Sequence, residues 1–335
     1  MRARFLIATL VTTGFLAIAG PAVAQCEPDG AVAFACGPIS PEDLAPIPDS
    51  PWVIVSSMED DGYLSFTDSR THQSSRAFPL SGSQPRHDTA VYGSCPGMTT
   101  DGFRPHGVGL RAGQDGIHTL YVVRHGQREA IEVFEVDTRG ATPTLVWIGC
   151  AVAPEELGLN AVVAVPDGDF AASSPRTSDV WEWTRADGWA RVPGSEDIGP
   201  NGLEITPDGN AFWVAGYAGQ SVIRLSRGQV PPRKETVGIG FNVDNIHWAS
   251  DGALLAAGHS TPTRTRVGEC MREQMCDGIT SRVSRVDTDA MAAQEFFTYP
   301  TNDFLLLGTA AVQVGAEIWV GGIAGGTRIA RVPAP

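Results

Sequence analysis

The chain has 335 residues and a formal net charge of −14, so it can bury a large core but is poorly suited to bind nucleic acid or an anionic membrane. Only 19% of its residues are charged, and 38 glycines and 24 prolines favour short strands and many turns over long helices. Composition therefore favours an all-β protein and argues against a nucleic-acid-binding function.

The first 24 residues predict a secretory signal peptide. Two arginines precede an apolar run, and an Ala-Val-Ala sequence that ends at Ala24 offers a cleavage site before Gln25. Cys26 leaves a lipoprotein as a minor alternative, which the large residue before it disfavours. No later segment approaches the roughly 20 apolar residues needed to span a bilayer. We expect no membrane span and a mature protein, residues 25–335, that is secreted or periplasmic.

A short pattern recurs six times in the mature chain: a turn marked by Gly or Asp, an apolar run and a small residue. In chain order the copies are 48–57, 112–123, 165–173, 206–216, 249–258 and 313–322. Their turn residues lie 41 to 66 positions apart, a period close to that of propeller blades. We therefore predict one domain that forms a six-bladed β-propeller. Segment 25–41 is expected to be irregular, and segment 262–282 to be an inserted loop.

Four polar side chains share one phase of this repeat, seven residues before the turn. They are Glu42, Asn160, Asn201 and Asp244. Blades arranged around an axis bring equal positions together, and a ring of carboxylate and amide oxygens suits Ca²⁺. The alternative is that these residues only shape turns or cap strands. The shared phase favours a calcium site at the centre of the propeller.

His106 has the same phase in the second repeat, seven residues before Gly113. An imidazole beside a bound cation can take a proton from water while the cation polarises a carbonyl group. His125, at the far end of the following strand, is a candidate to orient His106 or relay its proton. Four other histidines are expected to be structural: His72, His87, His118 and His247.

Six cysteines lie in the mature chain, an even number that predicts disulfides in an exported protein. Close neighbours and a link across adjacent repeats favour the pairs Cys26–Cys36, Cys95–Cys150 and Cys270–Cys276. Other pairings stay open, because spacing alone does not fix connectivity.

With these motifs, the chain resembles the paraoxonase family of calcium-dependent lactonases and arylesterases, within the gluconolactonase-like six-bladed propellers. The resemblance runs from about Pro41 to the C-terminus. It is carried by PEDLAPIPDSPWVIVSS, RPHGVGL, LYVVRHGQREAIEVFEVD, LNAVVAVPDG, NGLEITPDGNAFWVAG and VDNIHWASDGALLAAGH. Its specific part is the combination of PHG with Glu-Asp and Asp-Asn in the right repeats.

The resemblance implies a catalytic calcium held by five residues: Glu42, Asn160, Asn201, Asp244 and Asn245. It also implies that His106 acts as the base toward water, with His125 as its partner. His259 matches a histidine in the wall of the family's substrate pocket.

A second, structural calcium of the family would use Asp43 and the carbonyl of Val108. Ala161 stands where the family has an acidic residue, which weakens that site. The family also ties its termini with a disulfide, whereas no cysteine follows Cys276 here. Ring closure is therefore expected to depend on strand pairing, with the strand in GTRIARVP as a candidate.

Three functions are consistent with these features. The first is an exported hydrolase of small lactones or aryl esters, in which Ca²⁺ polarises the carbonyl and a water activated by histidine attacks it. The second is a binding propeller that keeps calcium for rigidity and performs no chemistry. The third is a sugar-lactone hydrolase of the gluconolactonase type with a more polar pocket, against which the PHG motif argues. A propeller fold alone cannot decide between them.

Overall fold

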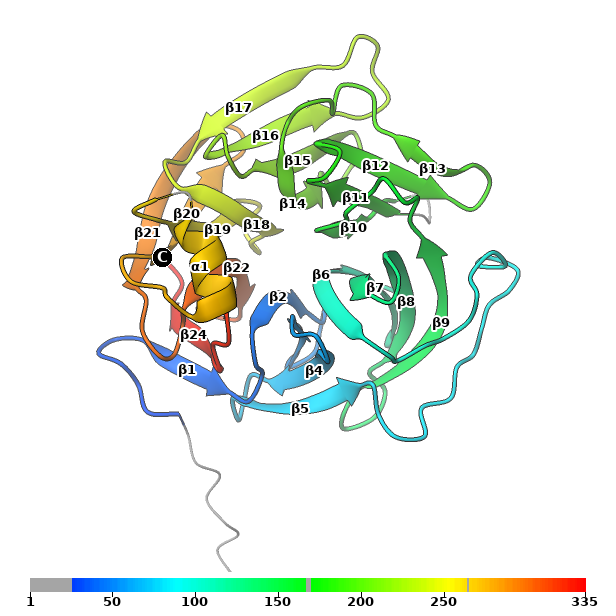
Figure 1. The fold of residues 1–335 in the computed structure, drawn as a ribbon, viewed down its shortest axis with the longest axis horizontal. Coiled ribbons are helices and arrows are strands. Elements are labelled where there is room, and N and C mark those ends of the chain that lie inside the picture. The colour runs from blue at the N-terminus through cyan, green and yellow to red at the C-terminus, as the bar shows by residue number, and fades with distance from the viewer. Residues whose placement is uncertain (1–25, 167–169, 264) are drawn as a thin grey trace, which may run out of the picture.

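The computed structural model describes residues 26–166, 170–263 and 265–335 (Figure 1). The predicted signal peptide and its cleavage site lie outside the described residues, as does Asp167, one of the six turn residues. None of the helices within the described ranges is long and apolar enough to cross a membrane.

The described strands form five sheets arranged in one ring, so the chain is an all-β propeller (Figure 1). Four sheets have four strands each, consecutive in the chain. They are β6 (Phe103–Arg111), β7 (Ile117–Gly126), β8 (Ala130–Asp137) and β9 (Thr144–Val152); β10 (Val162–Ala164), β11 (Phe170–Ser174), β12 (Asp179–Thr184) and β13 (Gly188–Arg191); β14 (Pro200–Ile205), β15 (Ala211–Gly216), β16 (Ser221–Ser226) and β17 (Lys234–Gly238); and β18 (Asn242–Trp248), β19 (Leu254–Ser260), β20 (Thr280–Asp287) and β21 (Ala292–Pro300).

The fifth sheet has eight strands and contains both ends of the described chain. Its strands are β1 (Ala33–Cys36), β2 (Pro41–Pro46), β3 (Trp52–Ser57), β4 (Tyr63–Asp68), β5 (Gln73–Phe78), β22 (Leu307–Val314), β23 (Glu317–Ile323) and β24 (Arg328–Pro333). They follow the order β2-β3-β4-β5-β1-β24-β23-β22. Its two halves join through a single parallel pair, Cys36 with Gln73.

Strand pairing between the two ends closes the ring, because β1 runs antiparallel to β24 from Ala33–Arg331 to Cys36–Arg328. The closing role of the last strand agrees with the sequence prediction, but the irregular conformation expected for 25–41 is wrong at β1. Phe34 and Ala35 are buried there, and pairing satisfies backbone groups that the edge of β24 would otherwise expose.

The predicted insertion at 262–282 contains a helix, α1 (Arg266–Glu273), rather than only a loop. An ion pair between Arg266 and Glu269, one turn apart, supports it. In Figure 1, α1 lies in front of the ring near β18 and β22. The structure contains three disulfides, Cys26–Cys36, Cys95–Cys150 and Cys270–Cys276, the same pairs that spacing favoured.

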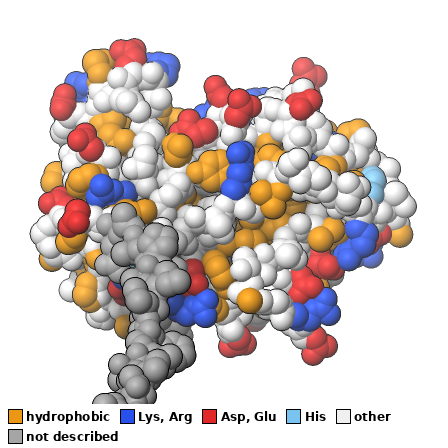
Figure 2. All heavy atoms as spheres, turned by 90° about the horizontal axis from the view of Figure 1, so that it is seen from below, with side chains coloured by type: hydrophobic (Ala, Val, Ile, Leu, Met, Phe, Trp, Pro, Cys, Tyr) orange, Lys and Arg blue, Asp and Glu red, His pale blue; other side chains and the backbone are white. Residues whose placement is uncertain are grey.

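Six strands line the axis of the ring: β2, β6, β10, β14, β18 and β22. Each contacts the next, and β22 contacts β2. The apolar core lies between the sheets, outside this inner circle, where Trp213 and Trp319 are 1% and 0% exposed. On the face drawn in Figure 2, acidic and basic side chains are interspersed.

Candidate active site

Five of the six inner strands are irregular at one common level. Their pairing with the next strand shifts register between Pro41 and Asp43, Pro105 and Val108, Pro200 and Leu203, Val243 and Ile246, and Gly308 and Ala310. The residues within these shifts include Glu42, His106, Asn201, Asp244, Asn245 and Thr309. Bulges of this kind turn side chains out of the regular alternation and are frequent beside active sites. The predicted ligand level therefore coincides with a ring of bulges.

Two glycines allow the inner strands to approach one another at this level. A Cβ added to Gly107 would lie 2.5 Å from the Asn160 carbonyl oxygen, and one added to Gly202 would lie 2.6 Å from the Asp244 carbonyl oxygen. In both dipeptides, His106-Gly107 and Asn201-Gly202, a polar side chain near the axis is followed by a glycine, whose missing side chain lets the neighbouring strand approach. Asn160 itself precedes β10, and its backbone N–H donates to the Ser173 carbonyl at 3.0 Å.

Glu42 lies at the centre of a group of polar side chains near the axis, which we call the axial cluster, and is only 1% exposed. Asn245 Nδ2 donates to Glu42 Oε1 at 2.8 Å, and His106 Nε2 lies 3.5 Å from the same oxygen. Asn160 Nδ2 lies 3.4 Å from His106 Nε2. The sixth inner strand contributes Thr309, whose hydroxyl donates to the Glu42 carbonyl at 2.6 Å. The structure therefore brings residues from five inner positions into one contact network.

Asp244 and Asn201 form a second, adjoining pair, in which the Asn201 side chain hydrogen-bonds to the Asp244 carboxylate. Burial raises the pKa of Asp244 well above its usual value, and the charges of Glu42 and Asp43 raise it further. Burial and the charge of Asp43 likewise raise the pKa of Glu42. Two buried carboxylates near each other disfavour ionisation unless a cation compensates them.

Three oxygens of this cluster are buried and have no hydrogen-bond partner: Glu42 Oε2, Asn160 Oδ1 and Asn201 Oδ1. Unsatisfied buried oxygens are costly and require an explanation such as a bound ion. Among the described residues, no group of three or more His, Cys, Asp or Glu side chains is arranged to hold a metal ion. The cluster instead mixes carboxylates with amides, the oxygen donors that a hard cation accepts. The donor set therefore fits calcium.

His106 and His125 lie side by side next to the cluster. His106 Nδ1 is 2.8 Å from His125 Nε2, and His125 Nδ1 is 2.8 Å from Glu129 Oε2. Burial lowers the pKa of His106 to about 4, and burial also lowers the pKa of His125. Both imidazoles are therefore neutral near pH 7, the state that a general base needs.

His259, expected in a pocket wall, lies on β19 and is 1% exposed. Its Nδ1 donates to the Gly308 carbonyl at 3.0 Å, and its Nε2 accepts the Tyr217 hydroxyl at 2.6 Å. Both ring nitrogens of His259 therefore have partners within the protein, which leaves neither free to take a proton from water. Tyr217, which no sequence pattern indicated, is within electrostatic reach of Asp244 as well as bonded to His259.

The residues of the predicted second calcium do meet, but in a different way. Asp43 Oδ1 accepts the Leu44 amide at 2.8 Å and lies 2.7 Å from His247 Nε2, while Oδ2 accepts the Val108 amide at 2.8 Å. Burial would lower the pKa of His247, but Asp43 and Glu204 outweigh it and raise this pKa to about 10. A protonated histidine therefore balances Asp43, and Val108 offers its amide, rather than the predicted carbonyl, to this carboxylate.

Replacing His247 with alanine is expected to reduce the free energy of unfolding by about 3 to 5 kcal/mol, because it leaves the buried Asp43 carboxylate unpaired. Urea unfolding measures this loss. The double variant His247→Ala, Asp43→Asn should recover part of it, since the uncompensated charge is gone. Equal stability of the His247→Ala variant and the native protein would show that the ion pair is unimportant.

Two cavities open at different ends of the inner strands. The larger, about 660 Å³, is lined by the candidate ligand Asn245, by Asp43 and Val108, and by residues toward the ends of these strands, such as Trp248. A cavity of about 410 Å³ is lined by Ser40 and Arg104, each two residues before a site residue, and by part of α1. The larger cavity therefore reaches a candidate ligand directly, whereas the smaller one is lined by sequence neighbours of Glu42 and His106.

Fold and site together define a propeller with an axial cluster of buried carboxylates and amides beside a histidine pair. The sequence matches no protein-family model and no curated protein. Solved structures with this fold include a gluconolactonase from Xanthomonas campestris, with a TM-score of 0.57 and 14% identity over 94% of this chain and 98% of that one. The calcium-binding protein regucalcin from Agrobacterium tumefaciens has a TM-score of 0.53 and 13% identity over 92% and 95%. Virginiamycin B lyase from Staphylococcus aureus has a TM-score of 0.53 and 10% identity over 91% and 99%.

At these identities the likeness shows the fold, which is that of the gluconolactonase-like and regucalcin-like propellers. Because unrelated activities share one propeller fold, the function has to be inferred from the site itself.

Proposed function

We propose that the protein is an exported, calcium-dependent hydrolase of small lactones or aryl esters, built on six blades. The observation that carries this proposal is the group of three buried, unpartnered oxygens on Glu42, Asn160 and Asn201, next to a neutral imidazole. We count the eight-stranded sheet as two blades, β2 to β5 and β22 to β24 with β1, because its halves join at one residue pair.

One calcium ion would be held by the oxygens of five residues: Glu42, Asn160, Asn201, Asp244 and Asn245. Such an ion supplies Lewis-acid polarisation of the substrate carbonyl and stabilises the oxyanion that develops on it. The occupied carboxylate of Asp43 supports one ion rather than two. Millimolar affinity is sufficient for calcium outside the cytoplasm.

His106 is the proposed general base. Its Nε2 faces Glu42 Oε1 at 3.5 Å, so a water between substrate and protein has a proton acceptor beside the carbonyl position. Water oxygen bonds to the carbonyl carbon, its proton passes to His106, and the carbon–oxygen bond to the leaving alcohol breaks. His106 then returns the proton to the alcohol oxygen, and a carboxylic acid results. His125 orients His106 during these steps.

An oxidising compartment is supported by the three disulfides, which persist in exported proteins and are rare in the cytosol. Secretion or a periplasmic location agrees with the predicted signal peptide. The proposed partner is a small-molecule lactone or ester, and the interspersed surface charges offer no support for nucleic-acid binding (Figure 2).

Sugar-lactone hydrolysis is the second candidate. The polar pair Tyr217 and His259 lies near the candidate ligand Asp244, and a gluconolactonase shares the fold. A third possibility is a binding propeller in which calcium only adds rigidity.

A substrate panel separates these functions. With calcium present, we expect turnover of an aliphatic lactone or phenyl acetate to exceed that of gluconolactone. The reverse order would favour the sugar-lactone hydrolase. Calcium binding without turnover of any of the three would favour the binding propeller.

A further inference from the structure

A carboxylate continues the histidine pair away from the axis. Glu129 lies in the turn between β7 and β8, and its Oε2 is 2.8 Å from His125 Nδ1. His125 Nε2 is 2.8 Å from His106 Nδ1, and His106 Nε2 faces the axial cluster. The three side chains thus form one hydrogen-bonded series that ends at the proposed base.

The carboxylate determines which nitrogen carries each hydrogen. An ionised carboxylate only accepts hydrogen bonds, so His125 Nδ1 carries the hydrogen that it donates to Glu129. The Nε2 of a neutral His125 then has only a lone pair and accepts the Nδ1 hydrogen of His106. This leaves a lone pair on His106 Nε2, toward which Asn160 Nδ2 points from 3.4 Å.

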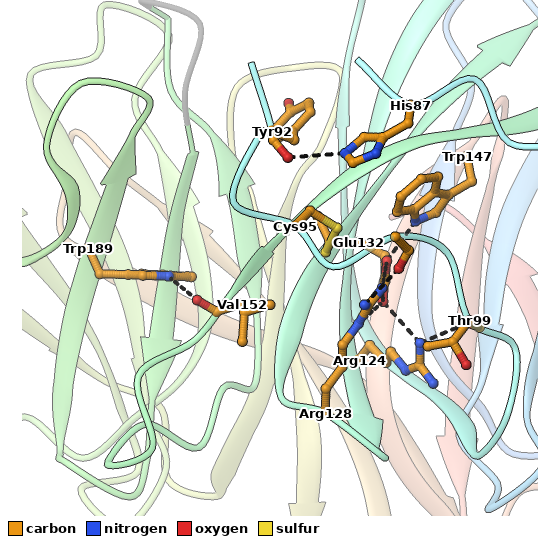
Figure 3. The surroundings of a disulfide bond; sticks show 12 residues. His87, Tyr92, Cys95, Thr99, Arg124, Arg128, Glu132, Trp147, Val152 and Trp189 are labelled. Atoms are coloured by element: carbon orange, nitrogen blue, oxygen red, sulfur yellow. Dashed lines mark hydrogen bonds and ion pairs between the residues drawn. A yellow bond between two sulfur atoms is a disulfide. The ribbon is translucent and has the colours of Figure 1, made fainter. Parts of the chain in front are cut away.

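Glu129 is itself held in place. Its Oε1 accepts the Leu159 amide at 2.6 Å, which ties the histidine series to the segment that carries Asn160. At the end of β7, Arg124 donates to the Thr99 carbonyl (Figure 3). In the turn itself, Arg128 donates to the Gly97 carbonyl. Both arginines also bind Glu132. The two arginines thus bind Glu132, whereas the Glu129 carboxylate accepts hydrogen bonds from His125 and from the Leu159 amide.

We propose that Glu129 is a positioning residue that fixes His125 and His106 in the tautomers that leave the basic lone pair on His106 Nε2. The catalytic consequence rests on the proposed hydrolase function, whereas the tautomers do not.

Glu129→Gln tests this role because glutamine keeps the shape of the side chain. Its amide oxygen can still accept the Leu159 amide, which turns the amide NH₂ toward His125 Nδ1. The tautomers of both histidines then reverse, and His106 Nε2 gains a hydrogen. We expect kcat to fall about 100-fold or more, since loss of a carboxylate that sets a tautomer has effects of this size and larger, with KM little changed.

Nitrogen-15 NMR of histidine-labelled protein provides a measurement that does not depend on activity. We expect Nδ1–H forms for His106 and His125 in the native protein, and Nε2–H forms in Glu129→Gln. Glu129→Asp should restore the Nδ1–H forms and part of kcat, and Glu155→Gln, at an exposed position, should change neither. Unchanged ring nitrogen signals in Glu129→Gln would overturn the proposal. If the native protein hydrolyses no substrate but the tautomers reverse, the hydrolase function fails while the positioning role stands.

Discussion

Replacement of His106 by alanine is expected to lower kcat for lactone hydrolysis by about 100- to 10,000-fold, the contribution of a well-placed general base. His106 is the group whose Nε2 faces Glu42 from 3.5 Å, and burial keeps its pKa near 4, so it is neutral across the working range. Calcium binding should persist, because the oxygen donors are unchanged. Steady-state kinetics with saturating calcium measures the effect.

His72→Asn is the matched control, because His72 lies away from the axis beside Trp319 and has a positive φ of 58° that asparagine tolerates. We expect its kcat to equal that of the native protein. In the pH dependence of kcat for the native protein, the acid limb should also lie well below pH 6.5, the ordinary pKa of histidine. The reason is that His106, with a pKa of about 4, becomes protonated only as the pH falls to that value. Full activity of His106→Ala would remove this residue from the mechanism.

Removal of calcium with EGTA is expected to lower the melting temperature strongly at pH 8 and weakly at pH 5. Burial raises the folded-state pKa of Glu42 and Asp244 above the ordinary values of 4.5 and 3.8. In metal-free protein, the stability that these groups contribute is complete below the ordinary values and is lost as pH rises through the raised ones. A bound cation favours the ionised forms, so its stabilising effect grows with pH. Calcium at 100 times its dissociation constant adds about 2.7 kcal/mol.

The variant Glu42→Gln, Asp244→Asn checks the origin of this effect, since it removes both charges and retains side chains of similar shape. We expect the metal-free variant to be more stable than the metal-free native protein at pH 8, and to show no shift with calcium. Differential scanning calorimetry with and without EGTA at the two pH values makes the comparison. Identical melting temperatures of the native protein in all four conditions would contradict a calcium at the axis.

The level of the site was predictable because the inner strands repeat one pattern around one axis. Stepping back seven residues from four turns identified Glu42, Asn160, Asn201 and Asp244. The structure places three of them within bulges of inner strands and Asn160 just before β10. The same step from Gly315 lands on Gly308, next to Thr309, because the bulge on β22 falls one position later. Periodicity therefore gave the level of the ring, and the individual bulges decide which residue reaches the axis.

Contacts that depend on a turn or on distant segments had no signal in the sequence. Glu129 sits in a short turn with no counterpart in the repeat, and only the paired course of β7 and β8 brings it to His125. His247 contacts Asp43, 204 positions away in the chain. The sequence therefore indicated that His247 is structural, but it did not indicate which residue His247 contacts. Likewise, the four residues of β1 form a strand by pairing with the edge of β24, which lies at the other end of the chain.

Calcium titration of metal-free protein, with heat and lactone hydrolysis followed in the same samples, tests whether hydrolysis depends on an ion bound at the axis. We expect one ion per chain, activity that rises in proportion to the bound ion, and loss of both in the Glu42→Gln, Asp244→Asn variant. Hydrolysis that proceeds at full rate without bound calcium, or unaltered calcium affinity in that variant, would contradict it.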